Sequence, residues 1–411
     1  MNNIEKYLLV HFKDVLKPPV KNLKKPFIVP GTGYLTELWG WDAYWEALSI
    51  KRAFEFFGEE ELLRAGVSKK TATEHICGSV INFLDAQEQD GYIPIMVSAG
   101  GLFEGFFQQE HAKGTPLNQH LPFLCQFALL ASDFAGDFGL NVEKLIKYMR
   151  YFEKEQYDEK SGLYFWKDDI MVGVDNNPTV FYRPKNSAAD IFLNCFIYLE
   201  YKALAEILTR SGDGRAKLAL DKAEKLKDAI NREMWDERDG IFYSQDIGVY
   251  KNRCIVKGVE LHSGLAPHWN AFPLKVRFWG CFLPMYAGIC NDIQAEKLCA
   301  HLTENDDFLA GYGIRTLAKN EKMYSLVKSA GNPSNWLGAV WVIANYCVYK
   351  GLVNYNKREL ARILKDKTVK LLNKALDNEG DLFESYHPDT GEHFMHPGFL
   401  SHNLPVIDML N

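Results

Sequence analysis

Two acidic residues, Asp175 and Glu384, lie in turns where a carboxyl group could act as an acid or a base. Asp175 belongs to a Gly-Val-Asp-Asn-Asn-Pro segment at residues 173–178, and an Asp among apolar and amide neighbours can have the raised pKa that a general acid needs. The same segment is an ordinary turn sequence, which composition alone favours. Glu384 lies between Phe383 and Tyr386, so it is either a solvated charge or a base candidate.

A third carboxylate, Asp42, is surrounded by aromatic residues. Residues 30–45 contain three tryptophans and two tyrosines and begin with a Pro-Gly-Thr-Gly run. Asp42 could cap a helix, with the tryptophans in the core. The flexible entry and the aromatic density favour a pocket wall instead, because aromatic faces stack on sugars and a carboxylate can accept two adjacent hydroxyl groups. A second aromatic segment places Trp336 in a polar loop and Trp341 before an apolar helix, where core packing is an alternative for Trp341.

The elements that must position these residues are mostly amphipathic helices. Apolar residues recur at three- and four-residue steps with charges on the opposite face, whereas the alternation typical of strands is scarce. Helices are therefore predicted at residues 44–57, 194–209, 215–234, 293–303, 341–350 and 357–376.

A weak internal repeat organises these helices. Long helical stretches lead into turns in which a Gly is followed by aromatic or branched apolar residues, and the glycines are roughly 70 residues apart. The copies lie at residues 90–93, 161–164, 239–242, 311–314 and 380–383, with an imperfect sixth at 39–42. Helix-ending Gly is common, so chance similarity is the alternative. Six helix pairs suit an all-α, closed (α/α)6 barrel of six hairpins, in which equivalent turns converge on one central funnel.

The bulk composition fits a large buried core and argues against two classes of partner. Hydrophobic residues make up 47% of the chain and aromatic residues 13%, and the net charge is -6. No segment combines clustered Lys and Arg with aromatic residues, so nucleic acid is not an expected partner. No stretch approaches 18 uncharged apolar residues, so no membrane span is expected.

Cysteine usage and linker composition predict one reduced, cytoplasmic domain. The eight cysteines have irregular spacing and form no Cys-x-x-Cys pair, and several lie in apolar runs typical of buried positions. No secretory signal precedes them. Because no Pro/Gly/Ser-rich linker divides the chain, residues 1–411 are predicted to form a single catalytic domain, with residues 1–27 as an N-terminal helical or loop extension.

Taken together, the motifs resemble glycoside hydrolase family 63 and the related trehalases of family 37. The motifs are Trp-Asp-Ala-Tyr-Trp at 41–45, Val-Asp-Asn-Asn-Pro at 174–178, Pro-Ser-Asn-Trp-Leu-Gly-Ala-Val-Trp at 333–341, Asn-Tyr at 345–346 and Glu-Ser-Tyr at 384–386. Residues 30–45 resemble a trehalase signature, while the later motifs fit family 63 better. The chain length is most similar to the short bacterial members that hydrolyse mannosylglycerate and glucosylglycerate.

The resemblance implies an (α/α)6 barrel that hydrolyses an α-glycosidic bond with inversion, without a metal or other cofactor. Asp175 falls on the general acid and Glu384 on the general base, which should lie about 6.5–9.5 Å apart to admit a water. The expected substrate is a small α-glucoside or α-mannoside such as glucosylglycerate or mannosylglycerate, with trehalase-like or oligosaccharide α-glucosidase activity as the alternative. The expected substrate-binding residues are Tyr34, Trp39, Trp41, Asp42, Tyr92, Gln109, Gly173, Trp336, Trp341 and His402.

The chain departs from the family pattern next to the expected pocket. His402 stands where a Trp is usual, and Ala339 replaces a usual Pro. The glycerate carboxylate would require a cation or several hydrogen-bond donors, and the nearby candidates are Arg183, Lys185 and His75. A neutral leaving group would instead favour more aromatic residues, and the sequence does not decide between the two. These departures affect the expected substrate more than the chemistry.

Two other functions fit the same barrel. A sugar epimerase or isomerase would use paired histidines, for which His393, His396 and His402 are the candidates. A sugar-binding protein would keep the tryptophans but would not need Asp175 or Glu384. The spacings of the late histidines match no metal motif.

Overall fold

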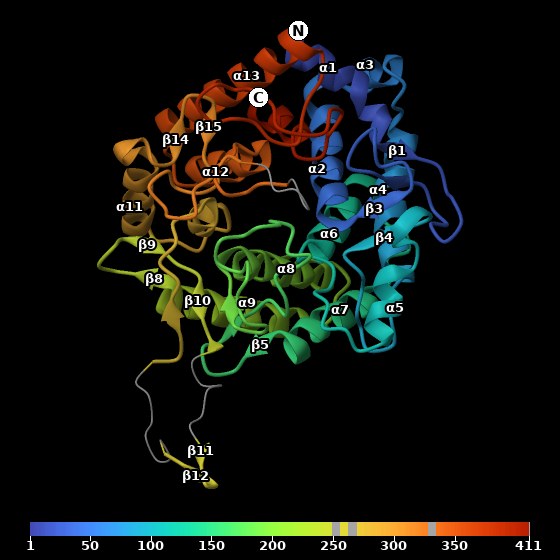
Figure 1. The fold of residues 1–411 in the computed structure, drawn as a ribbon. Coiled ribbons are helices and arrows are strands. Elements are labelled where there is room, and N and C mark those ends of the chain that lie inside the picture. Colours follow the sequence, from blue (N-terminus) through green and yellow to red (C-terminus); the bar gives the residue numbers. More distant parts are fainter. Residues whose placement is uncertain (249–254, 262–268, 328–333, 411) are drawn as a thin grey trace.

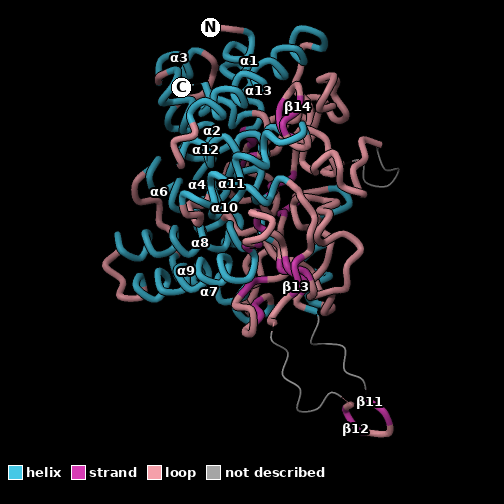
Figure 2. The backbone as a smooth tube through the Cα atoms, turned by 90° about the vertical axis from the view of Figure 1, so that its left-hand side faces the viewer, coloured by secondary structure: helices cyan, strands magenta, loops and turns pink. Residues whose placement is uncertain are grey.

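Helices are the main regular structure of the protein (Figure 1), and they gather on one side while loops and short strands gather on the other (Figure 2). The computed structural model describes residues 1–248, 255–261, 269–327 and 334–410. Cys254, Pro333 and the final residue, Asn411, therefore lie outside the described residues. None of the helices in the described ranges has the length and apolar character that crossing a membrane requires.

The α-helices are α1 (Asn3–His11), α2 (Gly40–Phe57), α3 (Glu59–Arg64), α4 (Lys69–Asp85), α5 (Phe106–Ala112), α6 (Leu124–Ala135), α7 (Val142–Glu155), α8 (Ile191–Arg210), α9 (Ala216–Ala229), α10 (Leu283–Tyr286), α11 (Asp292–Thr303), α12 (Val342–Asn354), α13 (Arg358–Glu379) and α14 (Ile407–Leu410). Shorter helical turns are η1 (Phe12–Val15), η2 (Gly101–Phe103), η3 (Ile230–Met234), η5 (Trp279–Phe282), η6 (Glu304–Asp306) and η7 (Leu404–Val406). The six predicted helices are confirmed as α2, α8, α9 with η3, α11, α12 and α13.

All strands are short. They are β1 (Leu16–Lys17), β2 (Phe27–Ile28), β3 (Glu37–Trp39), β4 (Met96–Ser98), β5 (Tyr157–Asp158), β6 (Leu163–Tyr164), β7 (Ala188–Ala189), β8 (Trp235–Asp236), β9 (Ile241–Phe242), β10 (Gln245–Asp246), β11 (Ile255–Val256), β12 (Val259–Glu260), β13 (Phe272–Pro273), β14 (Leu309–Ala310) and β15 (Gly313–Ile314). They pair antiparallel as β1-β2, β3-β4, β5-β6, β8-β9, β11-β12, β14-β15 and the three-stranded β13-β10-β7.

Three of the repeated glycine turns have a common local structure. The copies at 161–164, 239–242 and 311–314 form the hairpins β5-β6, β8-β9 and β14-β15, which follow α7, η3 and η6. In the first copy Gly162 has φ +74° and forms the tight turn, a conformation that residues with a side chain adopt only at a cost. At these three copies a helical segment leads into a short hairpin, whereas the copies at 90–93 and 380–383 form turns without strands and the copy at 39–42 runs from β3 into α2.

The long helices contact one another in a closed sequence. Helix α2 contacts α6, α6 contacts α8, α8 contacts α10, α10 contacts α12, and η7 contacts both α12 and α2. A second set lies against this one: α4 on α6, α7 and α9 on α8, and α13 on α12. Burial follows the same division, since 15 of the 20 residues of α8 are buried but only 4 of the 14 in α9. Apolar residues all around α8 and along one face of α9 produce this difference.

Cysteines contribute to the core as the sequence predicted. The seven cysteines in the described part of the chain are all buried and unpaired. They act there as small apolar side chains.

Candidate active site

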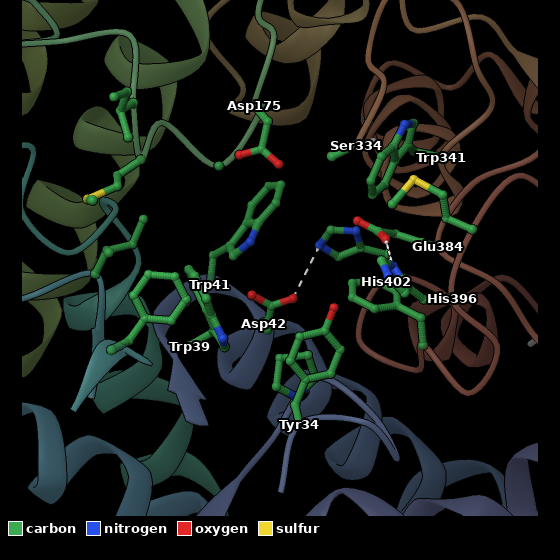
Figure 3. A pocket seen from close by; sticks show the side chains of 18 of the residues that line it. Tyr34, Trp39, Trp41, Asp42, Asp175, Ser334, Trp341, Glu384, His396 and His402 are labelled. Atoms are coloured by element: carbon green, nitrogen blue, oxygen red, sulfur yellow. Dashed lines mark hydrogen bonds and ion pairs between the residues drawn. The ribbon is translucent and has the colours of Figure 1, made fainter. Parts of the chain in front are cut away.

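A cavity of about 390 Å³ collects residues from both ends and the middle of the chain (Figure 3). Its volume falls in the range of small-molecule sites. Both predicted catalytic residues and seven predicted substrate-binding residues line it: Asp175, Glu384, Tyr34, Trp39, Trp41, Asp42, Gly173, Trp341 and His402.

Three predicted substrate-binding residues do not line the cavity. Tyr92 is fully buried and stacks on His111, with ring centroids 3.9 Å apart. Gln109 lies exposed on α5, whereas its neighbour Phe107 faces the cavity. Trp336 lies behind Trp341 and stacks on it at 3.9 Å. In each case the side chain points away from the cavity because of the direction of its helix or loop. The spacing of residues in the sequence does not determine that direction.

Asp42 lies in the first turn of α2 and lines the cavity. Strand β3, which pairs with β4, directly precedes this helix. The backbone amide of Gly40 donates to the carbonyl of Ile95 at 3.0 Å, which fixes the start of this helix. The Ser401 hydroxyl donates to Asp42 Oδ1 at 2.6 Å. Burial, followed by the charges of the other cavity carboxyls, raises the pKa of Asp42 to about 7.

A buried network of hydrogen bonds around Asp190 holds the loop that carries Asp175. Asp190 accepts hydrogen bonds from Asn177 Nδ2 at 3.1 Å, Thr179 Oγ1 at 3.1 Å and Ser244 Oγ at 2.8 Å. A buried carboxylate with several donors is fixed in place, because a lost partner would leave charge unpaired. The network therefore fixes the position of the Asp175 loop relative to Asp190.

Two further contacts hold the same loop against the tryptophan segments. Asn176 accepts a hydrogen bond from the backbone amide of Trp336 at 2.7 Å, which joins the loop to the tryptophan segment. Gly173 has φ +79° and lies over the Trp41 ring, where an added Cβ would come within 2.7 Å of Leu121 Cδ1. Only a glycine gives the backbone this conformation and this close approach.

A group of tryptophans forms one wall of the cavity. Trp41 and Trp341 face the cavity, and Trp336 packs between Trp341 and Trp279. The Trp341 indole N–H donates to the carbonyl of Asn335 at 2.8 Å, which fixes its ring. Apolar ring faces with restrained orientation are suited to stacking on a sugar.

Glu384 lies on the 383–397 hairpin, the segment joined by the bridges Phe383–Pro397 and Tyr386–His393. Its Oε2 lies 2.8 Å from His396 Nδ1, and the two side chains point toward each other across the hairpin (Figure 3). Burial raises the pKa of Glu384, the hydrogen bond and charge of His396 lower it, and the net direction is upward.

The two ends of the chain meet beside this hairpin. Gly31 and Phe399 form a bridge, and the amide of Leu400 donates to the carbonyl of Pro30 at 2.9 Å. The residues that carry Tyr34 and His402 are thereby held together.

Sequence reasoning missed several side chains that line the cavity. His396 was considered only for an isomerase, and its contact with Glu384 depends on hairpin pairing that no spacing rule indicates. The others are mostly apolar residues of the lining: Ile95, Phe103, Phe107, Ile170, Met171, Met395 and Phe399. Ile170 in this lining and the nearby Leu102 are exposed apolar side chains, which indicate a binding surface, but their exposure could not be read from the sequence.

The predicted glycerate-binding cations are engaged elsewhere. Arg183 pairs with Asp246, and Lys185 pairs with Asp168 at 2.7 Å. His75 Nδ1 lies 2.7 Å from a carbonyl oxygen of its own helix. Within the described ranges, neither Lys nor Arg lines the cavity.

A family model described as the mannosylglycerate hydrolase MGH1-like glycoside hydrolase domain matches residues 81–402. The chain belongs to this family. It is a glycoside hydrolase, and the resemblance to family 63 is confirmed. Membership in a glycoside hydrolase family favours hydrolysis over the sugar isomerase and the non-catalytic binding protein.

Curated relatives of this glycoside hydrolase are distant and longer. Alpha-glucosidase 2 of Arabidopsis thaliana is 21% identical over 375 residues, which are 77% of this chain and 47% of the relative. Mannosylglycerate hydrolase MGH1 of Selaginella moellendorffii is 30% identical over 110 residues, 27% of this chain and 20% of the relative. The chain thus spans about half the length, or less, of these relatives.

Solved structures share the fold over nearly the whole chain. The GH63 mannosylglycerate hydrolase from Thermus thermophilus in complex with glucose aligns with a TM-score of 0.66 at 17% identity, covering 98% of this chain and 97% of that one. Neutral trehalase from Saccharomyces cerevisiae aligns with a TM-score of 0.60 at 16% identity, covering 94% and 74%. The chain therefore has a helical glycosidase fold related to that of trehalases.

Proposed function

We propose that the chain is an inverting hydrolase of small α-glucosides or α-mannosides, with Asp175 as general acid and Glu384 as general base. The observation that carries this proposal is the meeting of these two carboxyl groups in one tryptophan-lined cavity, although they lie far apart in the sequence (Figure 3). The charge of Asp175 raises the pKa of Glu384, which supports their proximity. Paired carboxyl groups are the usual equipment of glycosidases.

In the proposed reaction, Asp175 in its protonated form donates to the glycosidic oxygen as the bond to the leaving group breaks. Glu384 in its ionised form removes a proton from a water molecule on the opposite face of the sugar ring, and that water attacks the anomeric carbon. The products are the free sugar with inverted configuration and the leaving-group alcohol. The hydrogen bond from His396 favours the ionised form of Glu384 that this role requires.

The proposed sugar site is the end of the cavity around Asp42. Its carboxylate would accept sugar hydroxyl groups, Trp41 and Trp341 would stack on apolar ring faces, and Tyr34 and Trp39 would complete the wall. Gly173 would contribute close backbone approach rather than a side chain. Tyr92 and Trp336 would act only indirectly, through packing, and Gln109, which is exposed on α5, would not take part.

We further propose that the closed sequence of helix contacts is an (α/α)6 barrel and that residues 1–411 form one domain. The inner members would be α2, α6, α8, α10, α12 and the η7-α14 segment. Loops at one end of this arrangement carry the cavity residues, as the six-hairpin arrangement requires.

The leaving group has two candidate classes. Mannosylglycerate follows from the names of relatives, and glucosylglycerate follows from the resemblance to the short bacterial members of family 63. An uncharged leaving group, as in trehalase-like or α-glucosidase activity, is favoured by the lining: three carboxyl groups and a wall of Ile170, Met171 and Phe103 would disfavour a carboxylate.

The test of this proposal is product analysis by proton NMR. Glucosylglycerate, mannosylglycerate, trehalose and α-linked gluco- and manno-disaccharides are incubated with the protein, and the first anomer released is recorded before mutarotation. Release of the β-anomer from an α-glycoside supports inversion by this site. Release of the α-anomer, or no hydrolysis of any α-glucoside or α-mannoside, would overturn the proposal.

A further inference from the structure

The imidazole of His402 is a buried polar group that lines the cavity. His402 is only 2% exposed, and neither nitrogen of its ring has a hydrogen-bond partner within the protein. Buried polar groups in folded proteins are nearly always paired, so an unpaired one beside a cavity indicates a ligand that pairs with it. A ligand in this cavity is the available partner.

The surroundings of His402 restrain the ring without using its nitrogens. Trp41 contacts it edge-on at 4.7 Å between centroids, and Phe399 contacts it at 5.0 Å. Burial lowers the pKa of His402 to about 3, so the ring is neutral at ordinary pH. A neutral imidazole has one nitrogen that donates and one that accepts.

The distance between His402 and Asp42 allows one hydroxyl group to contact both side chains. His402 Nε2 lies 3.6 Å from Asp42 Oδ1, too far for a direct hydrogen bond (Figure 3). A hydroxyl oxygen that lies in the cavity, to one side of the line joining these two atoms, can be within hydrogen-bond distance of both. Asp42 is itself held by Ser401 at 2.6 Å, so neither partner needs to move.

We propose that Asp42 and His402 jointly bind one hydroxyl group of the sugar and that His402 makes this hydroxyl a requirement for efficient turnover. The hydroxyl donates its hydrogen to the Asp42 carboxylate and accepts a hydrogen bond from the imidazole N–H. A sugar without this hydroxyl leaves both buried groups unpaired, which is a strong basis for discrimination. The inference rests on the proposed function, because it takes the ligand to be a sugar.

The experiment combines one protein variant with deoxygenated substrates. Fluoride release is measured for the wild-type chain and His402→Phe with α-D-glucosyl and α-D-mannosyl fluoride and with the monodeoxy derivatives of the faster one. For one ring position, deoxygenation is expected to lower kcat/KM of the wild type by about 100-fold. In His402→Phe the parent substrate falls by a similar factor, and the same deoxygenation costs less than about threefold, because the interaction has already been removed. Identical deoxygenation patterns in both proteins would overturn the inference.

Thermal unfolding distinguishes recognition from a structural role. Phe removes two polar atoms that have no partner in the protein, so the Tm of His402→Phe should equal or exceed that of the wild type. A lower Tm together with an unchanged deoxygenation pattern would assign His402 to packing. If His402→Phe does not fold, His402→Gln, which keeps a donor and an acceptor, should retain the selectivity for the same hydroxyl, and loss of folding in both would overturn the inference.

Failure of the proposed function gives a different result. In that case the wild type releases no fluoride from either sugar. Calorimetric titration with free D-glucose and D-mannose then decides: affinity at least about tenfold weaker in His402→Phe supports the inference, and equal affinity, or no binding to the wild type, overturns it.

Discussion

Glu384 Oε2 and His396 Nδ1 lie 2.8 Å apart, with the carboxylate buried and the histidine largely exposed at the cavity mouth. This arrangement opposes the effect of burial. Desolvation favours the protonated carboxyl group, while the imidazole favours the ionised form that can act as a base. We treat His396 as a positioning residue for Glu384, since it acts through that carboxylate.

Replacing His396 should move the acid limb of the pH profile. Without the imidazole the pKa of Glu384 rises further, so His396→Asn should lose kcat/KM at low pH and approach wild-type activity once Glu384 is ionised. The measurement is kcat/KM between pH 4 and 9 with an α-glycosyl fluoride. His393→Asn, on the same hairpin but outside the cavity, is the matched control. Superimposable profiles for His396→Asn and wild type would contradict the assigned role.

Removing either proposed catalytic carboxyl group should abolish turnover without unfolding the protein. Asp175→Asn and Glu384→Gln keep the side-chain shape, so each should lower kcat by about 10²–10⁴-fold while sugar binding persists. Turnover is followed by NMR and binding by calorimetry with glucose and mannose. Glu392→Gln, an exposed carboxyl group on the same hairpin, should leave kcat unchanged. Near-normal kcat in either catalytic variant would refute its assignment.

A methyl group at Gly173 should damage both stability and activity. Gly173→Ala forces a positive-φ conformation and brings Cβ to 2.7 Å from Leu121, which displaces the Asp175 loop. The exposed Gly139 has a similar φ, +75°, with nothing within 4 Å of an added Cβ, so Gly139→Ala should cost only about 1 kcal/mol. Urea unfolding and kcat/KM are measured for both. Equal stability and full activity in the two variants would show that the contact at Gly173 is relaxed without consequence.

The buried Glu46 should make stability depend on pH. It is fully buried on α2, its carboxyl oxygens have no hydrogen-bond partner in the protein, and burial, then the charge of Asp42, raises its pKa well above the usual value. The folded state therefore holds a proton that the unfolded chain releases above about pH 4.3, and the free energy of unfolding falls as pH rises, by up to about 1.4 kcal/mol per pH unit. Glu46→Gln should flatten this slope in urea unfolding between pH 5 and 8. Parallel slopes would mean that Glu46 is ionised in the folded protein.

Charge in the cavity should control the choice of leaving group. Glucosylglycerate and glucosylglycerol differ in one carboxylate, and the wild type should prefer the uncharged glycoside by about tenfold or more in kcat/KM. Ile170 lines the cavity and is 61% exposed, so Ile170→Arg should fold normally and shift the preference toward glucosylglycerate. Ile170→Gln is the uncharged control. A wild-type preference for glucosylglycerate would exclude the uncharged class.

The sequence was sufficient for six of the helices and for most of the predicted residues that line the cavity. Helical periodicity located α8 and α13 because their burial pattern repeats with the helix, and the aromatic segments around Asp42 and Trp341 could be identified from composition. Local patterns did not carry the direction of a side chain within a loop. Tyr92 shares the repeat of other turns, yet its ring packs on His111 instead of entering the cavity.

Long-range pairing was also beyond local reasoning. His396 contacts Glu384 because Phe383 pairs with Pro397 in the hairpin. The cation candidates Arg183 and Lys185 form ion pairs with Asp246 and Asp168 instead of lining the cavity. Such outcomes depend on which of several nearby groups a flexible side chain meets after the backbone is in place.

The hydrogen bond between Ser401 and Asp42 joins residues 359 positions apart. A chain being made on the ribosome, at about 5–20 residues per second, has Asp42 available early but lacks its partner until the segment that separates the two residues has emerged. The proposed sugar site therefore cannot form before Ser401 has been made, and a chain that ends before this residue should be inert toward cellular glycosides. Sugar bound at this junction would in turn oppose the local opening that exposes the final segment to proteases.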